Sequence, residues 1–303
     1  MRILVTGASG LLGGRLAALL RRSASVVAGR HLGAPPDGLP SVGIDLLSPE
    51  SVRLAILESR PDAILHSAAL ADPDRCESEP ERARALNVEA SRALARLARQ
   101  QRVRLVLLST DLVFPGEGGP FGESAPPRPL MVYGRTKLEG EEAALGEDPS
   151  AAVARVALVC GRGHGRRSTA SESVAWALLA GRRLRLYTDQ FRTPVDGGSL
   201  ASALVRLLGG REEGVFHMGG AERLSRYELG LRTARLMGLD ASLIDPVSST
   251  EGSHAPRPRD VSLDSSRAAR ELGFRPRPLD EALLESRRSP EEASEGPGEE
   301  GRV

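Results

Sequence analysis

Short apolar runs alternate with longer segments of helical periodicity along the first 160 residues. The short runs read as buried strands, and the longer segments repeat apolar residues every three to four positions. This alternation indicates βαβ units and a parallel sheet covered by helices on both faces, a doubly wound α/β architecture of the Rossmann type. The expected strands are 2–7, 25–30, 62–69, 104–110 and 151–159, and the expected helices are 11–22, 48–60, 79–101 and 133–145.

The pattern loosens after about residue 160. Here we expect helices at 199–210, 225–239 and 264–274 and a strand at 214–220. Two helix starts are marked by Ser48 before Pro49 and by the capping-box pair Ser225 and Glu228. We therefore expect a first domain over 1–160, with 191–215 returning to it, and a second region over 161–285. The stretch 286–303 has no large apolar residue before its final valine, so we expect a disordered tail.

The bulk composition narrows the class of protein. Of 303 residues, 27% are charged, and the formal net charge is +1, so nothing suggests nucleic acid or a membrane surface as a partner. No apolar run approaches the ~20 residues of a membrane-spanning helix. Cys76 and Cys160 form no spaced set, which argues against a disulfide framework and a zinc site. The N-terminal run is strand-like rather than a signal peptide, so we expect a cytoplasmic protein.

The stretch TGASGLLGG places three glycines directly between the first expected strand and the first expected helix. Glycine permits a tight turn and a close approach to a pyrophosphate, and a helix N-terminus adds unpaired N–H groups and a partial positive charge. We therefore predict that 1–160 is a dinucleotide-binding domain. Its predicted phosphate-binding residues are Gly7, Ser9, Gly10, Leu11, Leu12 and Gly13.

The end of the second expected strand bears on the choice of cofactor. NAD-binding versions of this fold usually carry Asp or Glu there to hold the ribose hydroxyls. This chain has Gly29 and Arg30 instead, and an arginine can pair with a 2′-phosphate. The sequence thus favours NADPH, with NADH as the alternative if Arg30 is only one exposed arginine among many.

Lys137 is the only lysine among 41 basic residues, and it follows Tyr133 by four positions. On a helix the two side chains share one face. A nearby ammonium lowers the pKa of a tyrosine, which can then exchange a proton with a carbonyl or alcohol oxygen near neutral pH. Lysine also offers a compact charge that can hold ribose hydroxyls, whereas the wide fork of arginine would place its charge differently. We predict that Tyr133 and Lys137 are catalytic and contact the cofactor.

Together, TGASGLLG, YGRTK and LLSTDLVFPG resemble the extended short-chain dehydrogenase/reductase family, within it the branch of dTDP-4-dehydrorhamnose reductase and its relatives. The likeness covers residues 1–285 and includes DRCESEPERARALNV (74–88), DQFRTPVDGGSLA (189–201) and RPRDVSLDSS (257–266). The glycine turn and Tyr-x-x-x-Lys are specific to the superfamily. STDLVF followed by YGRTK narrows the resemblance to the reductase-like branch.

This resemblance implies roles for further residues. Thr110 matches a catalytic hydroxyl that binds the substrate carbonyl, and Asp111 lies beside it at the substrate. Asn87 matches a supporting asparagine, with a helix residue that caps a neighbouring loop as the alternative. Leu158 stands where the reductase has a tryptophan against the sugar, a departure that concerns the exact substrate. The residues matched to the cofactor are Asp45 and Leu46 at the adenine and Ser67, Ala68 and Ala69 after the third strand.

The second region should supply the substrate pocket. Arg192, in DQFRTP, is the better substrate-binding candidate because its stretch resembles the pocket of the family. The loop GRGHGRR offers Arg162, His164, Arg166 and Arg167, which could bind a diphosphate by charge-assisted hydrogen bonds, although a solvated loop is favoured. We expect His217, within an apolar run, to be a satisfied buried histidine.

These residues predict an NADPH-dependent reductase of a nucleotide-linked 4-keto-deoxysugar, in which Tyr133 donates the proton and Thr110 holds the carbonyl. One alternative is an epimerase or dehydratase of the same family. Dehydratases generally add acidic residues beside the catalytic hydroxyl, and here Asp111 is followed by Leu112, which favours the reductase. Another is a cofactor-binding regulatory subunit resembling the β subunit of methionine adenosyltransferase. The sequence also leaves a homodimer open.

Overall fold

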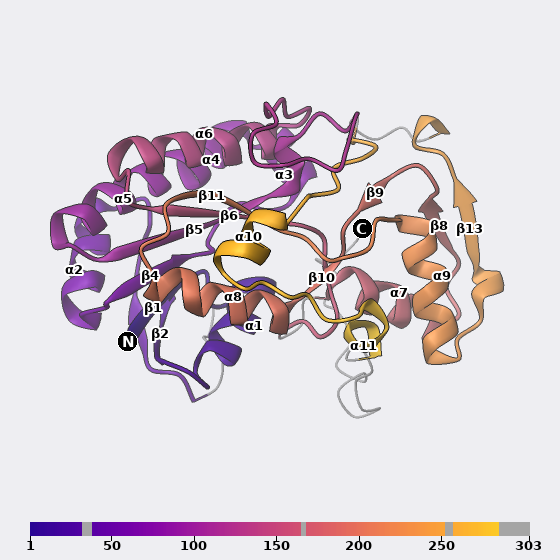
Figure 1. Ribbon diagram of the computed structural model, residues 1–303, viewed down its shortest axis with the longest axis horizontal. Coiled ribbons are helices and arrows are strands. Elements are labelled where there is room, and N and C mark those ends of the chain that lie inside the picture. The colour runs from indigo at the N-terminus through magenta and orange to yellow at the C-terminus, as the bar shows by residue number, and fades with distance from the viewer. Residues whose placement is uncertain (32–37, 165–167, 252–256, 285–303) are drawn as a thin grey trace.

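The computed structural model describes residues 1–31, 38–164, 168–251 and 257–284. The expected tail over 286–303, Arg166 and Arg167 lie outside the described residues. Figure 1 shows a sheet with its helices in one half of the molecule, and α7, α9, β8 and β13 in the other half.

Within the described residues, one central sheet has seven parallel strands in the order β11-β6-β5-β4-β1-β2-β3. The predicted doubly wound architecture is therefore confirmed. Strand order reverses between β1 and β4, and open parallel sheets bind ligands beyond the carboxyl ends of the strands at such a switch point. The strands are β1 (Arg2–Thr6), β2 (Ser25–Arg30), β3 (Ser41–Gly43), β4 (Ala63–His66), β5 (Arg104–Thr110), β6 (Ala152–Val156) and β11 (Gly214–Met218).

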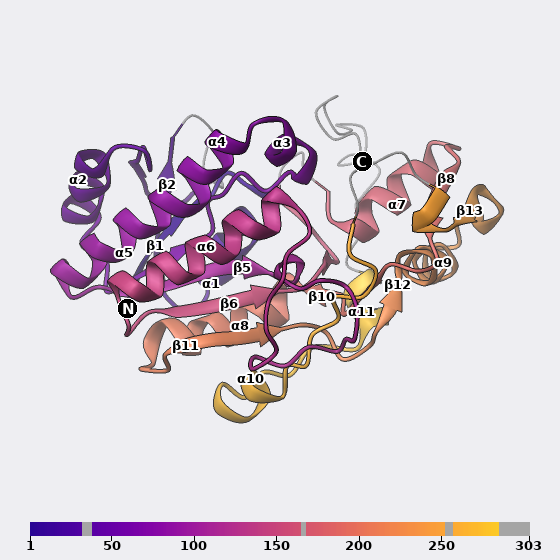
Figure 2. The ribbon, with the colours of Figure 1, turned by 90° about the horizontal axis from the view of Figure 1, so that it is seen from above.

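Helices cover both faces of this sheet (Figure 2). On one face α1 packs against α8, and on the other α5 packs against both α2 and α6. Successive residues of β1 alternate between the two cores: Ile3 and Val5 belong to one and Leu4 to the other. Strands buried on both faces are mainly apolar, which explains the nearly continuous runs in the sequence. These helices are α1 (Leu11–Leu20), α2 (Pro49–Ser59), α5 (Ala90–Gln101), α6 (Val132–Glu147) and α8 (Gly197–Gly209).

The segment expected as one helix over 79–101 is instead divided. It consists of α4 (Pro80–Arg84), a π-helical turn η1 (Ala85–Glu89) and α5, and it is preceded by α3 (Pro73–Ser78). Asp72 caps α3 by accepting hydrogen bonds from the N–H groups of Asp74 and Arg75. Proline begins both short helices, because a first helical turn does not need the N–H that proline lacks.

The other half of the molecule, which contains α7 and α9, is built from helices and very short strand pairs. α7 packs against α9, and β8 and β13 lie beside them. The predicted capping box of Ser225 and Glu228 is confirmed at the start of α9, and Ser48 caps α2 as expected. The remaining strands are β7 (Val159–Cys160), β8 (Leu184–Tyr187), β9 (Phe191–Arg192), β10 (Val195–Asp196), β12 (Leu224–Ser225) and β13 (Ile244–Val247). The remaining helices are η2 (Asp111–Val113), α7 (Ala170–Leu179), α9 (Arg226–Met237), η3 (Ala241–Leu243), η4 (Ser249–Glu251), α10 (Ser266–Glu271) and α11 (Leu279–Leu284).

Both cysteines are buried, and neither forms a disulfide bond. No helix among the described residues is both long enough and apolar enough to cross a lipid bilayer. The same part of the chain contains no cluster of three or more His, Cys, Asp or Glu side chains that could hold a metal ion.

Candidate active site

The glycine turn lies at the switch point of the sheet, between β1 and α1. Gly7 has φ +69°, and a Cβ there would lie 2.7 Å from the Ala68 backbone. At Gly13 a Cβ would lie 2.3 Å from both the Gly7 carbonyl oxygen and Ser67 Oγ. Gly10 caps α1 with no side-chain acceptor, so the first-turn N–H groups face outward from the helix end. The turn is therefore closed to side chains and presents backbone donors.

The other predicted cofactor residues follow the carboxyl ends of neighbouring strands. Ser67 donates a hydrogen bond of 2.6 Å to the Thr6 carbonyl, which joins the segment after β4 to β1. Asp45 and Leu46 follow β3, where the Asp45 carboxylate accepts from the Leu47 N–H at 3.0 Å. Arg30 is exposed at the end of β2, and its Nε donates to Ser41 Oγ at 3.3 Å. Ser9 is exposed, and Leu11, Leu12, Ala68 and Ala69 are half-buried.

Thr110, Tyr133 and Lys137 meet where β5 faces α6. Tyr133 and Lys137 lie one turn apart on α6, as their spacing predicts. Lys137 is buried, and its Nζ donates to the Leu108 carbonyl at 2.7 Å, two residues before Thr110 on β5. Tyr133 is hydrogen-bonded to the Thr110 side chain. The structure thus brings the three predicted catalytic side chains together.

The electrostatics of this group differ from the sequence prediction. Burial raises the pKa of the Tyr133 hydroxyl, the Asp111 carboxylate raises it further, and the hydrogen bond to Thr110 offsets only part of the change. The Tyr133 pKa is therefore raised overall, and the prediction that Lys137 lowers it stays a prediction. Burial lowers the pKa of Lys137 to about 8 despite the opposing effect of Glu141.

Asn87 sits in the π-helical turn and holds together three parts of the site. Its Oδ1 accepts from the Leu70 N–H at 2.8 Å, and its Nδ2 donates to the Leu70 carbonyl at 3.1 Å. The same Nδ2 donates to Thr136 Oγ1 on α6 at 3.0 Å. π-helical turns are frequent at functional sites. The amide of Asn87 is therefore engaged in fixing the loop after β4 against the helix that carries Tyr133 and Lys137.

On the substrate side, Asp111 follows Thr110 and is buried. Its Oδ1 accepts from Thr110 Oγ1 at 3.1 Å, whereas its Oδ2 accepts no hydrogen bond from the described residues. Arg192 Nε lies 3.9 Å from that Oδ2. Burial raises the pKa of Asp111 to about 6, and the Arg192 charge only partly opposes this. An incompletely paired buried carboxylate is typical of a ligand-facing position rather than of a stability element.

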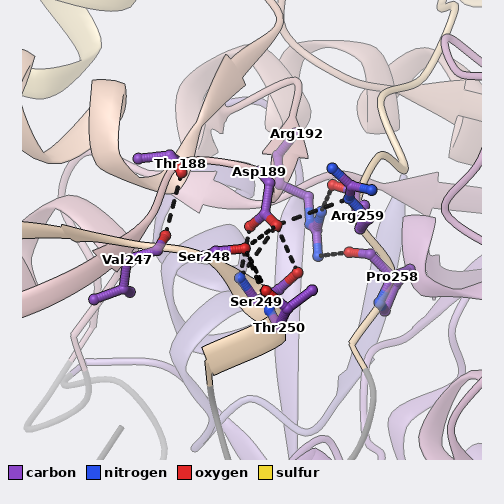
Figure 3. A network of polar contacts seen from close by, with 9 residues as sticks. All are labelled: Thr188, Asp189, Arg192, Val247, Ser248, Ser249, Thr250, Pro258 and Arg259. Carbon is purple, nitrogen blue, oxygen red and sulfur yellow. Dashed lines mark hydrogen bonds and ion pairs between the residues drawn. The ribbon is translucent and has the colours of Figure 1, made fainter.

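Arg192 is buried and contributes to a network that holds the segment after residue 256 (Figure 3). Its Nη1 donates to the Phe191 carbonyl at 2.7 Å, and its Nη2 to the Pro258 carbonyl at 3.3 Å. Asp189 in the same view accepts from the Ser249 N–H at 2.9 Å and lies 3.8 Å from Arg259 Nε. Arg192 is therefore fixed by backbone acceptors, with its Nε side toward Asp111.

Some residues of the site were missed or only partly interpreted from the sequence. Arg226, at the start of α9, has its pKa lowered to about 10 by burial and then by Arg192 and Arg257. The mutual effect of these like charges indicates a region that favours an anion. Of the GRGHGRR loop, Arg162 is exposed, whereas His164 packs against α1, so that a Cβ on Gly14 would lie 2.1 Å from its ring.

Two further side chains have packing roles. Leu158 is half-buried and packs against the cluster of Cys160, Leu229 and Leu283. His217 is buried and hydrogen-bonded to the Phe121 carbonyl at 2.9 Å, which confirms the expected satisfied histidine.

A family model described as the RmlD substrate binding domain matches residues 1–289. The chain belongs to the RmlD substrate-binding domain family. One relative of this RmlD-family chain, "Probable low-salt glycan biosynthesis reductase Agl14" of Haloferax volcanii, is 34% identical over 282 residues, which cover 90% of the chain and 93% of the relative. Methionine adenosyltransferase 2 subunit beta of Xenopus laevis is 32% identical over 276 residues, covering 88% and 81%.

Solved structures agree with this membership. A hypothetical dTDP-4-dehydrorhamnose reductase from Sulfolobus tokodaii has a TM-score of 0.80 and 34% identity, covering 92% of the RmlD-family chain and 98% of its own. A Thermus thermophilus UDP-glucose 4-epimerase in complex with NAD has a TM-score of 0.80 and 26% identity, covering 94% and 97%. The resemblance to the reductase-like branch is therefore confirmed at the level of family and fold.

Proposed function

We propose that this chain is a reductase of a nucleotide-linked 4-keto-deoxysugar and that it uses NADPH. The observation that carries the proposal is the meeting of Thr110, Tyr133 and Lys137 at the carboxyl edge of the sheet. That edge also contains the glycine turn. A proton donor and a dinucleotide-binding turn thus share one end of the molecule.

The residues of the turn fit a dinucleotide. A Cβ at Gly7 or Gly13 would fill the space against Ala68 and Ser67, so the backbone is free to approach a pyrophosphate. The N-terminal N–H groups of α1 would bind the phosphates, and Arg30 would pair with a 2′-phosphate. NADPH would supply the hydride that reduces the ketone. Lys137, next to Tyr133 on α6, would hold the nicotinamide ribose hydroxyls.

The protein side chains would supply the proton and the orientation. The raised pKa of Tyr133 keeps its hydroxyl neutral at pH 7, and the neutral form can donate a proton to the oxygen of the forming alcohol. Thr110 would donate a hydrogen bond to that same oxygen and fix its position. A hydride on carbon and a proton from Tyr133 on oxygen together convert C=O to CH–OH.

The substrate side would bind the nucleotide-linked sugar. The like-charge group of Arg192, Arg226 and Arg257 supports an anionic substrate, since guanidinium groups bind phosphate oxygens by charge-assisted hydrogen bonds. Leu158 and the buried Asp111 would contact the sugar. The names of the relatives from Haloferax volcanii and Sulfolobus tokodaii, both reductases, support the same reaction class.

A second candidate is a regulatory subunit that binds the cofactor without turnover. The relative from Xenopus laevis named as a methionine adenosyltransferase 2 subunit beta favours it. The two functions differ in whether Tyr133 does chemistry. A regulatory subunit would associate with a transferase at fixed stoichiometry and would reduce no keto-sugar.

The deciding experiment follows NADPH oxidation with dTDP-4-keto-6-deoxy-L-mannose by wild-type protein and by Tyr133→Phe. Loss of the proton donor should lower turnover by roughly 10²–10⁴-fold and leave NADPH affinity nearly unchanged. Tyr187→Phe, a half-buried tyrosine on β8, is the matched control and should behave as wild type. Wild-type turnover in Tyr133→Phe would exclude Tyr133 as the donor, and absence of turnover in all three proteins would favour the regulatory candidate.

A further inference from the structure

A row of buried polar side chains crosses three adjacent strands beside the catalytic group. Ser109 on β5 is the register partner of Arg155 on β6, and Arg155 is the register partner of His217 on β11. All three side chains are buried. Ser109 directly precedes Thr110, so the row lies next to the catalytic hydroxyl along β5.

The carboxylate of Glu141 on α6 lies over this row. Ser109 Oγ donates to its Oε1. Arg155 Nε lies 3.1 Å from both carboxylate oxygens, and Arg155 Nη2 donates to Oε2 at 2.7 Å. Glu141 and Arg155 side chains are only 2% and 5% exposed. The pair is therefore a fully buried, bidentate ion pair that joins α6 to two strands.

His217 closes the row as a neutral group. Its Nδ1–H donates to the Phe121 carbonyl at 2.9 Å, which leaves Nε2 as an acceptor for Arg155 Nη1 at 3.4 Å. Burial lowers the pKa of His217, in agreement with this neutral tautomer. Arg155 also lies 5.3 Å from the centre of the Phe114 ring. Glu141 is thus the negative group of the row, and it is the charged group that acts to raise the Lys137 pKa.

Lys137 lies one turn before Glu141 on the same face of α6. Both side chains are buried and both bind β5: Lys137 at the Leu108 carbonyl and Glu141 at the Ser109 hydroxyl. On β4, the other titratable group that interacts with Lys137 is a histidine. His66 on β4 is neutral, since burial and then Lys137 lower its pKa to about 3, and Ser91 on α5 lies 3.3 Å from its Nε2.

We propose that Glu141, held by Ser109 and Arg155, is the positioning residue for Lys137. It fixes the register of α6 on β5 so that Tyr133 and Lys137 face Thr110, and its carboxylate supplies the negative charge that keeps the buried ammonium protonated. The contribution of Glu141 to catalysis rests on the proposed reductase function. The effect of Glu141 on the charge of Lys137 does not, because it requires neither cofactor nor substrate.

A purely structural role makes a different prediction. Replacing a buried ion pair by well-packed residues of similar volume is often neutral or stabilising, so a neutral pair could also hold α6 to the sheet. Such a replacement would leave Lys137 unchanged if Glu141 only packs. If Glu141 compensates the charge of Lys137, the same replacement lowers the pKa of Lys137, because an opposite charge nearby favours the charged form.

The single lysine makes this measurable. Protein labelled with [13Cε]-lysine gives one side-chain signal, whose shift with pH reports the midpoint of Lys137 alone. We expect a wild-type midpoint near 8 and a midpoint lower by about one pH unit in Glu141→Gln/Arg155→Met. Glu142→Gln, an exposed neighbour with the same change of charge, should leave the midpoint unchanged. An unchanged midpoint in the double variant would overturn the proposal.

Two further variants protect the test against misfolding. Glu141→Gln/Arg155→Leu is a second neutral replacement of the pair, and it repeats the measurement if the first double variant does not fold. Glu141→Asp keeps the charge and should restore most of the wild-type midpoint. A midpoint in Glu141→Asp as low as in the double variants would show that loss of packing, not of charge, causes the shift.

Turnover then tests the catalytic consequence. In an active protein the alkaline limb of the pH profile should move to lower pH in the double variant by the same amount as the Lys137 midpoint, with less change at low pH. A uniform fall at every pH would contradict the proposed coupling. If no variant and no wild-type protein reduces a keto-sugar, the proposed function fails, and the lysine titration still decides the role of Glu141.

Discussion

Gly13 on α1 and Ser67 after β4 lie so close that a Cβ on residue 13 would be 2.3 Å from the Ser67 hydroxyl oxygen. The same Cβ would be 2.3 Å from the Gly7 carbonyl oxygen. Because the second contact is with backbone, the strain cannot be relieved by turning a side chain. The glycine turn is therefore a packing requirement of the free protein as well as a candidate phosphate site.

Gly13→Ala should accordingly lower both stability and cofactor affinity. Overpacking of this kind costs about 1–3 kcal/mol. Urea unfolding and fluorescence titration with NADPH measure the two effects. The matched control is Gly146→Ala on α6, where a Cβ meets nothing within 4 Å and where alanine should stabilise the helix by about 0.5–1 kcal/mol. Equal stability of both variants would mean that α1 can shift away from Ser67.

Arg30→Ala should weaken NADPH binding more than NADH binding, because only NADPH carries the 2′-phosphate that the guanidinium would pair with. Dissociation constants for both cofactors, measured at one salt concentration, give the ratio. Arg22→Ala, an exposed arginine just after α1, controls for the general loss of a positive charge. Equal losses of affinity for NADPH and NADH in Arg30→Ala would contradict the proposed preference for NADPH.

Asp111 should make the protein less stable as the pH rises through about 6. Its folded pKa is raised from 3.8 to about 6, so the folded state holds a proton that the unfolded state has lost, and this contribution is fully present only below the unfolded value. Between pH 4 and 8 the contribution falls by about 2 kcal/mol. Asp111→Asn removes this titration but keeps the shape.

The measurement is the difference in unfolding free energy between wild type and Asp111→Asn as a function of pH. Taking the difference cancels the contribution of His66, whose lowered pKa acts in the opposite direction in both proteins. The unfolding free energy of Asp111→Asn should increase relative to that of wild type as the pH rises from 4 to 8. A difference that does not vary with pH would show that Asp111 titrates normally.

We expect Asp189 to stabilise the half of the molecule that contains α7 and α9. It accepts hydrogen bonds from the N–H and hydroxyl of Ser249 and from the Ser248 hydroxyl. Although burial acts to raise the pKa of Asp189, these bonds outweigh it and hold the pKa below the ordinary value. Asp189→Ala should cost about 1–3 kcal/mol in thermal or urea unfolding. Asp245→Ala, which breaks an exposed pair with Arg183, should cost less than about 1 kcal/mol.

The sequence predicted the parts of this molecule in which local signals and burial agree. Strands covered on both faces are mainly apolar, so six of the seven strands of the central sheet could be recognised, and Tyr133 and Lys137 share a helix face by spacing alone. β9 and β12 could not be found, since strands of two residues show no alternation. The π-helical turn escaped because its residues fit a continuous helix as well.

The row of buried polar side chains could not be predicted from the sequence, for a different reason. Ser109, Glu141, Arg155 and His217 are spread over more than a hundred residues, and a parallel sheet brings them together only through its strand order. One signal was present: Arg155 interrupts the apolar run AAVARVALV, and a charge inside a doubly covered strand requires a buried partner. The raised pKa of Tyr133 was equally hidden, because it follows from depth of burial rather than from residue spacing.

The π-helical turn η1 also determines how the segment before it is rotated about the helix axis relative to α5. An α-helix advances about 100° per residue, so one residue gained or lost within η1 rotates the preceding segment relative to α5 by that angle. At present Ala83 and Leu86 pack toward Leu70 and Cys76, while Leu94 and Ala98 pack onto the sheet. A one-residue deletion that rewound η1 into regular helix would keep the backbone hydrogen bonds but turn Asn87 away from Leu70. The number of residues in η1 is therefore constrained as tightly as their identity.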